Sequence, residues 1–78
     1  MVPRRANRSP EGQKFGDVVR RLRKECGLSQ EALAERADLA ADYVGFIERG
    51  ENVPTLTVIL RLAKALRISP SDLLRDFK

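Results

Sequence analysis

The sequence contains no histidine and only one cysteine, Cys26. A single cysteine cannot build a disulfide framework within one chain, and without histidine it does not supply the ligands of a zinc site. The sequence also lacks a cysteine–base pair or a cluster of carboxylates from which a catalytic centre could be assembled. We therefore expect no enzymatic activity, no metal and no cofactor.

Long hydrophobic runs are missing as well. No apolar stretch reaches the length of a membrane helix or of a signal-peptide core, which predicts a cytoplasmic protein without a membrane partner. The 78 residues suffice for one domain and leave no room for a separate ligand-sensing domain, so no small-molecule ligand is expected. Because so small a domain buries a limited share of its surface, dimerisation is a plausible source of further stability.

Positive charge is concentrated at the N-terminal end. Residues 1–24 hold eight basic and two acidic side chains, whereas the remainder of the chain carries a net charge of −2 within a total of +4. This asymmetry favours a polyanionic partner, most simply nucleic acid. The alternative is a basic tail that only improves solubility.

Residues 1–10 form the most basic and least apolar part of this region. They carry two prolines and three arginines and cannot offset the cost of ordering by burial, so they are predicted to be a flexible arm, followed by a domain over residues 11–78. Arginine-bearing arms of this kind enter the DNA minor groove, which makes Arg4 and Arg5 candidate DNA contacts. The alternative is a disordered start without a role.

The stretch from Leu28 to Gly50 predicts two short helices joined by a tight turn. Ser29 is a good N-cap for a helix over residues 30–37, Asp38 suits a left-handed turn, and Gly50 suits the end of a second helix over residues 41–49. The second helix carries one inward row and a second face that the chain does not cover locally. This arrangement is typical of a helix-turn-helix.

The same stretch resembles the Cro/cI repressor family, also called the XRE family. The resemblance covers residues 14–75 and rests on Leu22-Arg23, Gly27-Leu28-Ser29-Gln30, Leu33-Ala34, Ala37, Leu39, Tyr43-Val44, Ile47-Glu48-Arg49-Gly50, Pro54, Leu56, Leu60, Ala63, Ala65-Leu66 and Leu73-Leu74. It implies an all-α, compact five-helix bundle of the phage-repressor (lambda repressor-like) type with a central helix-turn-helix. It also implies a sequence-specific transcription regulator that binds double-stranded DNA as a homodimer on a palindromic operator.

Apolar periodicity places the other helices around this unit. The first runs from residue 11–13 to Cys26 and ends at Gly27. The fourth follows the cap Thr55 and runs to about residue 66. The fifth opens with a Ser-Pro-Ser-Asp sequence at residues 69–72. The predicted core rows are Phe15, Val19, Leu22 and Cys26 in the first helix; Leu39, Tyr43, Val44 and Ile47 in the third; and Leu56, Ile59, Leu60, Ala63 and Leu66 in the fourth.

The resemblance implies that the third helix enters the major groove. Its base-facing positions carry Ala41, Asp42, Gly45 and Phe46, none of which makes the strong bidentate contacts of arginine or amide side chains. Asp42 either accepts a hydrogen bond from cytosine or stabilises the N-terminal end of the helix dipole. Further candidate DNA contacts are Ser29 and Gln30 at the start of the second helix, Tyr43, Arg49 as a phosphate clamp, and Asn52.

Two structural contacts are expected in addition to the DNA contacts: an ion pair and a dimer interface. The resemblance implies an ion pair between Arg23, beside core residue Leu22, and Glu48; the alternative is that both are solvated. The candidate dimer interface consists of Leu56, Leu74 and Phe77, the apolar residues that one chain covers least easily.

Within the family, a phage-type repressor and a restriction–modification controller both suit a chain of this size. The rival from another class is an antitoxin-like module that neutralises a toxin and uses DNA only for autoregulation. An apolar Phe46 on a helix face with few hydrogen-bonding side chains favours that rival.

Overall fold

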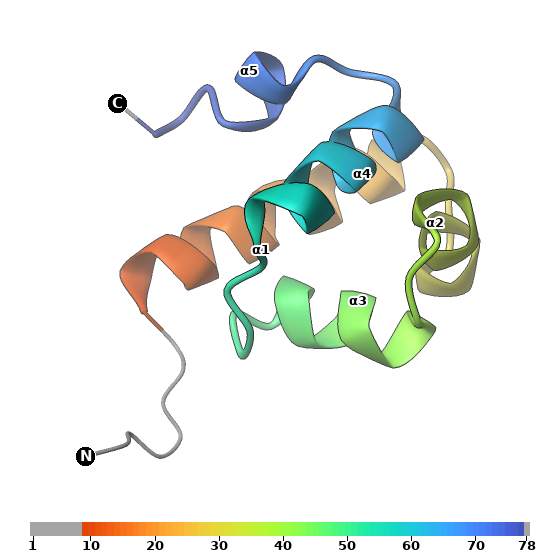
Figure 1. Ribbon diagram of the computed structural model, residues 1–78, viewed down its shortest axis with the longest axis horizontal. Coiled ribbons are helices and arrows are strands. Elements are labelled where there is room, and N and C mark those ends of the chain that lie inside the picture. Colours follow the sequence, from red (N-terminus) through yellow and green to blue (C-terminus); the bar gives the residue numbers. More distant parts are fainter. Residues whose placement is uncertain (1–8, 78) are drawn as a thin grey trace.

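The computed structural model of the protein describes residues 9–77, which form five α-helices and no strand (Figure 1). The helices are α1 (Pro10–Glu25), α2 (Gln30–Ala37), α3 (Ala41–Glu48), α4 (Leu56–Leu66) and α5 (Pro70–Leu73). The predicted all-α, five-helix architecture is confirmed. None of these helices is both long and apolar enough to cross a membrane. Arg4 and Arg5 lie outside the described residues.

Local sequence explains where the helices begin and end. Side-chain oxygens accept a hydrogen bond from the backbone N–H three residues ahead in four of the five helices, at Ser9, Ser29, Thr55 and Ser69. Ala40 precedes α3 without such a cap, as its side chain predicts. Asp38 ends α2 in the left-handed region with φ 59°, and Gly50 follows α3 with φ 75°. The predicted turn and stop residues of the central unit are therefore confirmed.

The core lies between α1, α2, α3 and α4, with α1 packed on α3 and α4, and α5 covers one end (Figure 1). Helix α2 packs on α3 and α4, and α5 packs on α4. The buried apolar side chains come from all five helices: Phe15, Val18, Val19, Leu33, Ala34, Ala37, Val44, Ile47, Leu62, Ala63, Ala65, Leu66 and Leu73. This packing fixes α2 and α3 relative to each other and leaves the outer face of α3 outside the core.

The predicted core row of α4 was wrong at two positions. Leu56 is 68% exposed and Leu60 is 44% exposed, whereas Leu62, absent from the prediction, is fully buried. The buried arc of α4 centres on the side of Leu62 and Leu66, and Leu56 and Leu60 fall beyond its edge. The polar residues of α4, Thr57, Arg61 and Lys64, fall on one exposed stripe, and Leu60 lies on the same stripe, so the sequence pattern already indicated that Leu60 faces away from the core.

The predicted row of α1 also needs correction at its C-terminal end. Cys26 is the exposed C-cap, and its Sγ lies 3.9 Å from the carbonyl oxygen of Leu66. Leu22 is half-buried, and Val18 is buried beside the predicted Val19. The row is thus rotated toward residues 15, 18, 19 and 23, which places the charged Arg23 in the interior.

Candidate nucleic-acid interface

The central unit consists of α2, a short turn and α3, held together by apolar packing and backbone hydrogen bonds. Leu33 and Val44 are fully buried between the two helices and the rest of the core. In the turn, the N–H of Leu39 donates to the carbonyl oxygen of Ala34 at 2.8 Å. The left-handed backbone of Asp38 reverses the chain there, so α3 leaves at an angle and presents an outer face.

A buried ion pair ties the end of α3 to α1. Arg23 Nε donates to Glu48 Oε2 at 2.6 Å and Arg23 Nη2 donates to Glu48 Oε1 at 3.1 Å, so the pair is bidentate. The two side chains are 10% and 3% exposed. A hydrogen bond to Glu48 raises the pKa of Arg23, and burial opposes that rise. The predicted ion pair between Arg23 and Glu48 is therefore present, and the alternative, in which both side chains are solvated, is wrong.

Two further contacts complete the network around this pair. Arg23 Nη1 donates to the carbonyl oxygen of Leu28 at 2.8 Å, in the loop that precedes α2. Gln30 Nε2 donates to Glu48 Oε1 at 3.0 Å. Gln30, a predicted DNA contact, thus also holds α3, and the buried carboxylate joins α1, α2 and α3.

The N-terminal end of α2 stands beside the outer face of α3. Ser29 Oγ caps α2 by accepting a hydrogen bond from the N–H of Ala32 at 3.0 Å. Between the two helices lies a shallow hollow of about 170 Å³. The predicted contacts Gln30, Ala41, Asp42, Gly45, Phe46 and Arg49 line it together with Glu31. The structure thus brings most of the predicted DNA-binding residues to one surface.

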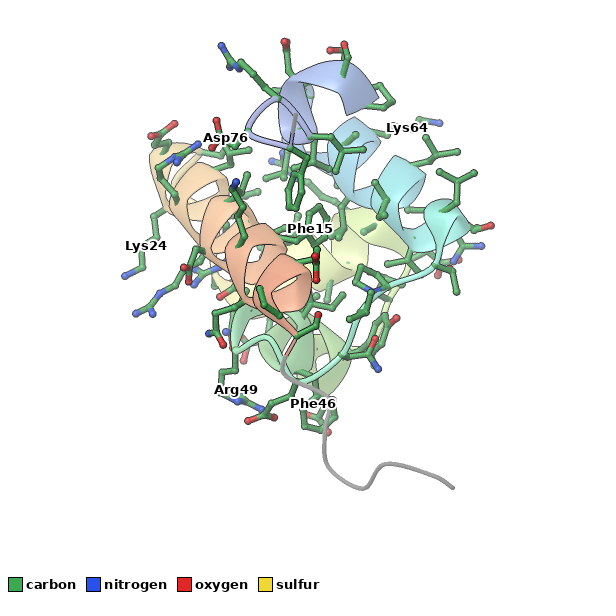
Figure 2. The ribbon with its side chains drawn as sticks, turned by 90° about the vertical axis from the view of Figure 1, so that its left-hand side faces the viewer. Phe15, Lys24, Phe46, Arg49, Lys64 and Asp76 are labelled. Carbon is green, nitrogen blue, oxygen red and sulfur yellow. The ribbon has the colours of Figure 1, made fainter. Side chains whose placement is uncertain are left out.

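Gly45 differs from the expectation of an exposed glycine. It is buried, because the Arg49 side chain covers it: a Cβ placed on Gly45 would lie 3.1 Å from Arg49 Nη1. Phe46 remains 43% exposed, as predicted, and Arg49 lies 5.3 Å from the centre of its ring (Figure 2). A larger side chain at position 45 would displace this arginine.

Arg49 has an acidic partner that was not predicted from the sequence. Its Nε and Nη2 donate to the two carboxylate oxygens of Glu51 at 3.2 and 3.3 Å. The signal was the opposite charge two residues beyond, across the end of α3. Since an arginine side chain has five N–H donors, this pairing leaves others available. Tyr43 and Asn52, the remaining candidates on this side, are half-buried.

The three candidate dimer residues do not form one exposed patch. Leu74 and Phe77 are half-buried and line a small apolar cavity of about 120 Å³ with Phe15 of α1. The Lys14 ammonium lies 5.2 Å from the centre of the Phe77 ring. Leu56 does not line that cavity. It is one of three exposed apolar side chains at or near the first half of α4, which we call the apolar strip: Val53, which also lines the cavity, Leu56 and Leu60.

Comparison with known proteins finds one matching family and several similar control proteins. The helix-turn-helix family HTH_3 matches residues 19–73. The chain is 44% identical to control protein C.BamHI of Bacillus amyloliquefaciens over 64 residues, which cover 81% of this chain and 78% of that protein. It is 46% identical to control protein C.SmaI of Serratia marcescens over 60 residues, or 77% and 71% of the two chains.

One solved structure resembles this fold over nearly the full length of the solved chain and most of the length of this one. The crystal structure of the restriction-modification controller protein C.AhdI from Aeromonas hydrophila superposes with a TM-score of 0.81 and 46% sequence identity. The match covers 83% of this chain and 98% of that one.

Proposed function

The chain belongs to the helix-turn-helix family HTH_3 and is a DNA-binding transcription regulator, and we propose that it is a restriction–modification controller that binds a palindromic operator as a homodimer. The observation that carries this proposal is the outer face of α3, which lies beside the N-terminal end of α2 and leaves Asp42, Phe46 and Arg49 exposed. The likeness to controllers from three bacteria favours this role over a phage-type repressor.

Helix α3 supplies the base contacts in this proposal. Ala41 and Phe46 meet thymine methyl groups in the major groove. Asp42 accepts a hydrogen bond from cytosine N4, or stabilises the positive end of the helix dipole where the uncapped Ala40 leaves backbone N–H groups free. None of these contacts matches the strength of a bidentate arginine–guanine pair, so the remaining affinity has to come from the DNA backbone.

Helix α2 and the end of α3 supply the backbone contacts. The first N–H groups of α2, with Ser29 and Gln30, form a site suited to a phosphate. Gln30 remains fixed by Glu48 while its other amide hydrogen is free to donate. Arg49 clamps a second phosphate with the donors that Glu51 does not use, and Tyr43 and Asn52 lie at the edge of this surface.

Replacing Phe46 by alanine tests the role of α3. Because Phe46 is 43% exposed, the free energy of unfolding should fall by less than about 1 kcal/mol, whereas truncating a core phenylalanine costs about 3–5 kcal/mol. Operator affinity should fall by about tenfold or more. Urea unfolding and fluorescence titration of a labelled duplex give the two quantities. The matched core variant Phe15→Ala should instead lose stability, and the same loss in Phe46→Ala would contradict the proposed role.

The apolar strip is the proposed dimer contact, with Leu74 and Phe77 at its margin. Leu56→Asp should convert the dimer to a monomer at micromolar concentration, because a buried unpaired carboxylate opposes association. Sedimentation velocity measures the change. Thr57→Asp is the matched control, since it adds the same charge one residue further along at another exposed position. A wild-type protein that sediments as a monomer both free and on DNA would refute the homodimer.

The arm is proposed to add affinity through Arg4, Arg5 and Arg8, which lie outside the described residues. Truncation should remove residues 2–8 and keep Ser9, because Ser9 caps α1. The slope of log K against log salt should then decrease by up to about 0.9 per lost arginine contact. Titration of both proteins on one operator at several salt concentrations measures it, and parallel lines would show that the arm does not touch DNA.

The controller role itself is tested in the cell. Transcription of neighbouring methyltransferase and endonuclease genes should change when the chain is expressed, and should not change when Phe46→Ala is expressed at the same level. The antitoxin alternative makes a different prediction: a toxin gene as neighbour, and a toxin protein that co-purifies with the chain. Finding that neighbour and that complex would replace the controller assignment.

A further inference from the structure

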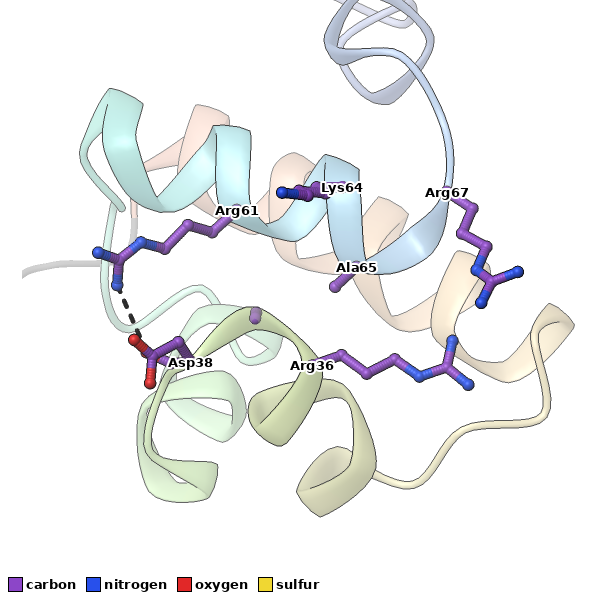
Figure 3. A pocket seen from close by; sticks show the side chains of 7 residues that line it. Arg36, Asp38, Arg61, Lys64, Ala65 and Arg67 are labelled. Atoms are coloured by element: carbon purple, nitrogen blue, oxygen red, sulfur yellow. Dashed lines mark hydrogen bonds between the residues drawn. The ribbon is translucent and has the colours of Figure 1, made fainter.

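A basic hollow lies on a flank of the molecule that the DNA-binding proposal does not use. It has a volume of about 500 Å³ and lies between the C-terminal end of α2 and the second half of α4. Ala37 and Ala65 contribute small apolar surfaces to it. Four cationic side chains surround it (Figure 3): Arg36, Arg61, Lys64 and Arg67.

These cations are not neutralised by the protein. Within residues 9–77, the side chains of Arg36, Lys64 and Arg67 form no ion pair and donate no hydrogen bond. Arg61 Nη1 donates to a backbone carbonyl oxygen, that of Asp38, at 3.4 Å. Asp38 also supplies the one carboxylate that lines the hollow, so its four cations exceed its anions by three. Like charges brought together from two helices favour binding of an anion between them.

The Lys64 side of the hollow lies away from the surface that faces DNA, whereas Asp38 on its other side belongs to the turn between α2 and α3. Figure 2 places Lys64 toward the opposite end of the molecule from Phe46 and Arg49. An operator docked on α3 therefore does not reach the side of Lys64. The lining of the hollow has no aromatic ring and no amide side chain. The hollow therefore offers positive charge and arginine N–H donors but little that would distinguish one nucleic-acid base from another.

We propose that this hollow binds a small oligophosphate anion, a chain of linked phosphates such as a nucleoside polyphosphate carries. Three guanidinium groups and one ammonium match the several charges and many acceptor oxygens of such a chain. The volume lies in the range of small-molecule sites in proteins. The expectation of no small-molecule ligand rested on the lack of room for a separate sensing domain, whereas this site lies within the helix-turn-helix domain itself.

Binding at this position would join the two helices that line it. Arg36 belongs to α2, the first helix of the DNA-binding unit, and Lys64 belongs to α4, against which α2 packs. A ligand held by both stabilises the native state, because the two side chains are brought together only in the folded chain. No residue that lines this hollow also lines the hollow beside α3, so the two proposals are tested with different residues.

The test is a thermal unfolding series with sodium tripolyphosphate as the probe and sodium chloride at matched ionic strength as the reference. At about five times the dissociation constant, tripolyphosphate should raise the Tm by about 4–8 °C. The variant Arg36→Gln/Lys64→Gln should lose this rise. The matched variant Arg20→Gln/Lys24→Gln should keep it, because it removes one arginine and one lysine from exposed positions of α1. ATP should produce a shift no larger than tripolyphosphate does.

Three results would overturn the proposal. The first is no rise in Tm beyond the sodium chloride reference. The second is an equal rise in both double variants, which would show general binding to a basic protein. The third is a non-operator duplex that binds the wild type but not Arg36→Gln/Lys64→Gln and is not displaced by tripolyphosphate, which would assign the hollow to a nucleic-acid backbone. Operator affinity, measured in parallel, should be the same for both variants.

Discussion

The Glu48→Gln protein is expected to unfold with a free energy about 3 kcal/mol below that of the wild type. Glutamine keeps the shape of the side chain but removes the charge that compensates Arg23, whose side chain is only 10% exposed. For a domain of this size, the loss corresponds to a decrease in Tm of roughly 12 °C or more. Urea unfolding followed by circular dichroism, at one fixed protein concentration, measures it.

A surface ion pair in α1, the helix that also carries Arg23, provides the matched control. Arg21 and Glu25 approach to 3.9 Å with side chains 57% and 64% exposed, so Glu25→Gln should leave the free energy of unfolding close to that of the wild type. A double-mutant cycle with Arg23→Met and Glu48→Leu should give a coupling energy above about 1.5 kcal/mol. A coupling near zero would mean that the pair does not hold α1 to α3.

Gly16→Ala should have an effect of similar size for a different reason. A Cβ at position 16 would overlap the carbonyl oxygen of Ile47 and lie 2.7 Å from that of Glu48, both backbone atoms at the end of α3. Overpacking of this kind costs about 1–3 kcal/mol, and here the cost should lie at the upper end because neither neighbour is a flexible side chain. Since the same contact positions α3, operator affinity should fall as well.

Another glycine of α1 provides the comparison. A Cβ at Gly12 would lie 3.1 Å from a side-chain methyl of Val53, which is 59% exposed, and 3.2 Å from the Ser9 hydroxyl, so its nearest neighbours are side-chain atoms and not backbone. Gly12→Ala should therefore be neutral or slightly stabilising, because alanine favours the helix by up to about 1 kcal/mol. Chemical unfolding of the two variants side by side tests the argument. If Gly16→Ala is as stable as Gly12→Ala, α1 and α3 do not pack as closely as the structure indicates.

The order of the helices could be predicted from the sequence because capping and turn residues stand at the helix ends. Ser29 and Ser69 are caps, and Asp38 and Gly50 supply the left-handed and positive-φ residues that end α2 and α3. These signals are local and depend on side chains next to the backbone groups they satisfy. The Arg23–Glu48 pair, which spans 25 residues, was predicted only because the chain resembles a family in which the pair occurs.

Packing between helices determines several features that local sequence signals do not predict. In α4, Leu56 lies in the same row as the buried Ala63, so only packing shows that Leu56 is exposed, whereas Leu60 lies on the stripe of polar residues and could have been placed correctly. A glycine inside a helix, such as Gly16, suggests a close approach by a neighbour, but only the structure identifies the end of α3 as that neighbour. The contact between Arg49 and Glu51 depends on the path of the chain after α3.

Selection of bound sequences from a random pool of DNA duplexes tests the central claim most directly, since it makes no assumption about the operator. We expect strong enrichment of one motif with two inverted half-sites, their centres about 34 Å or one helical turn apart. Phe46→Ala should enrich that motif weakly or not at all. A wild-type protein that enriches no motif, or a single half-site without symmetry, would contradict the account of a homodimer that recognises DNA with α3.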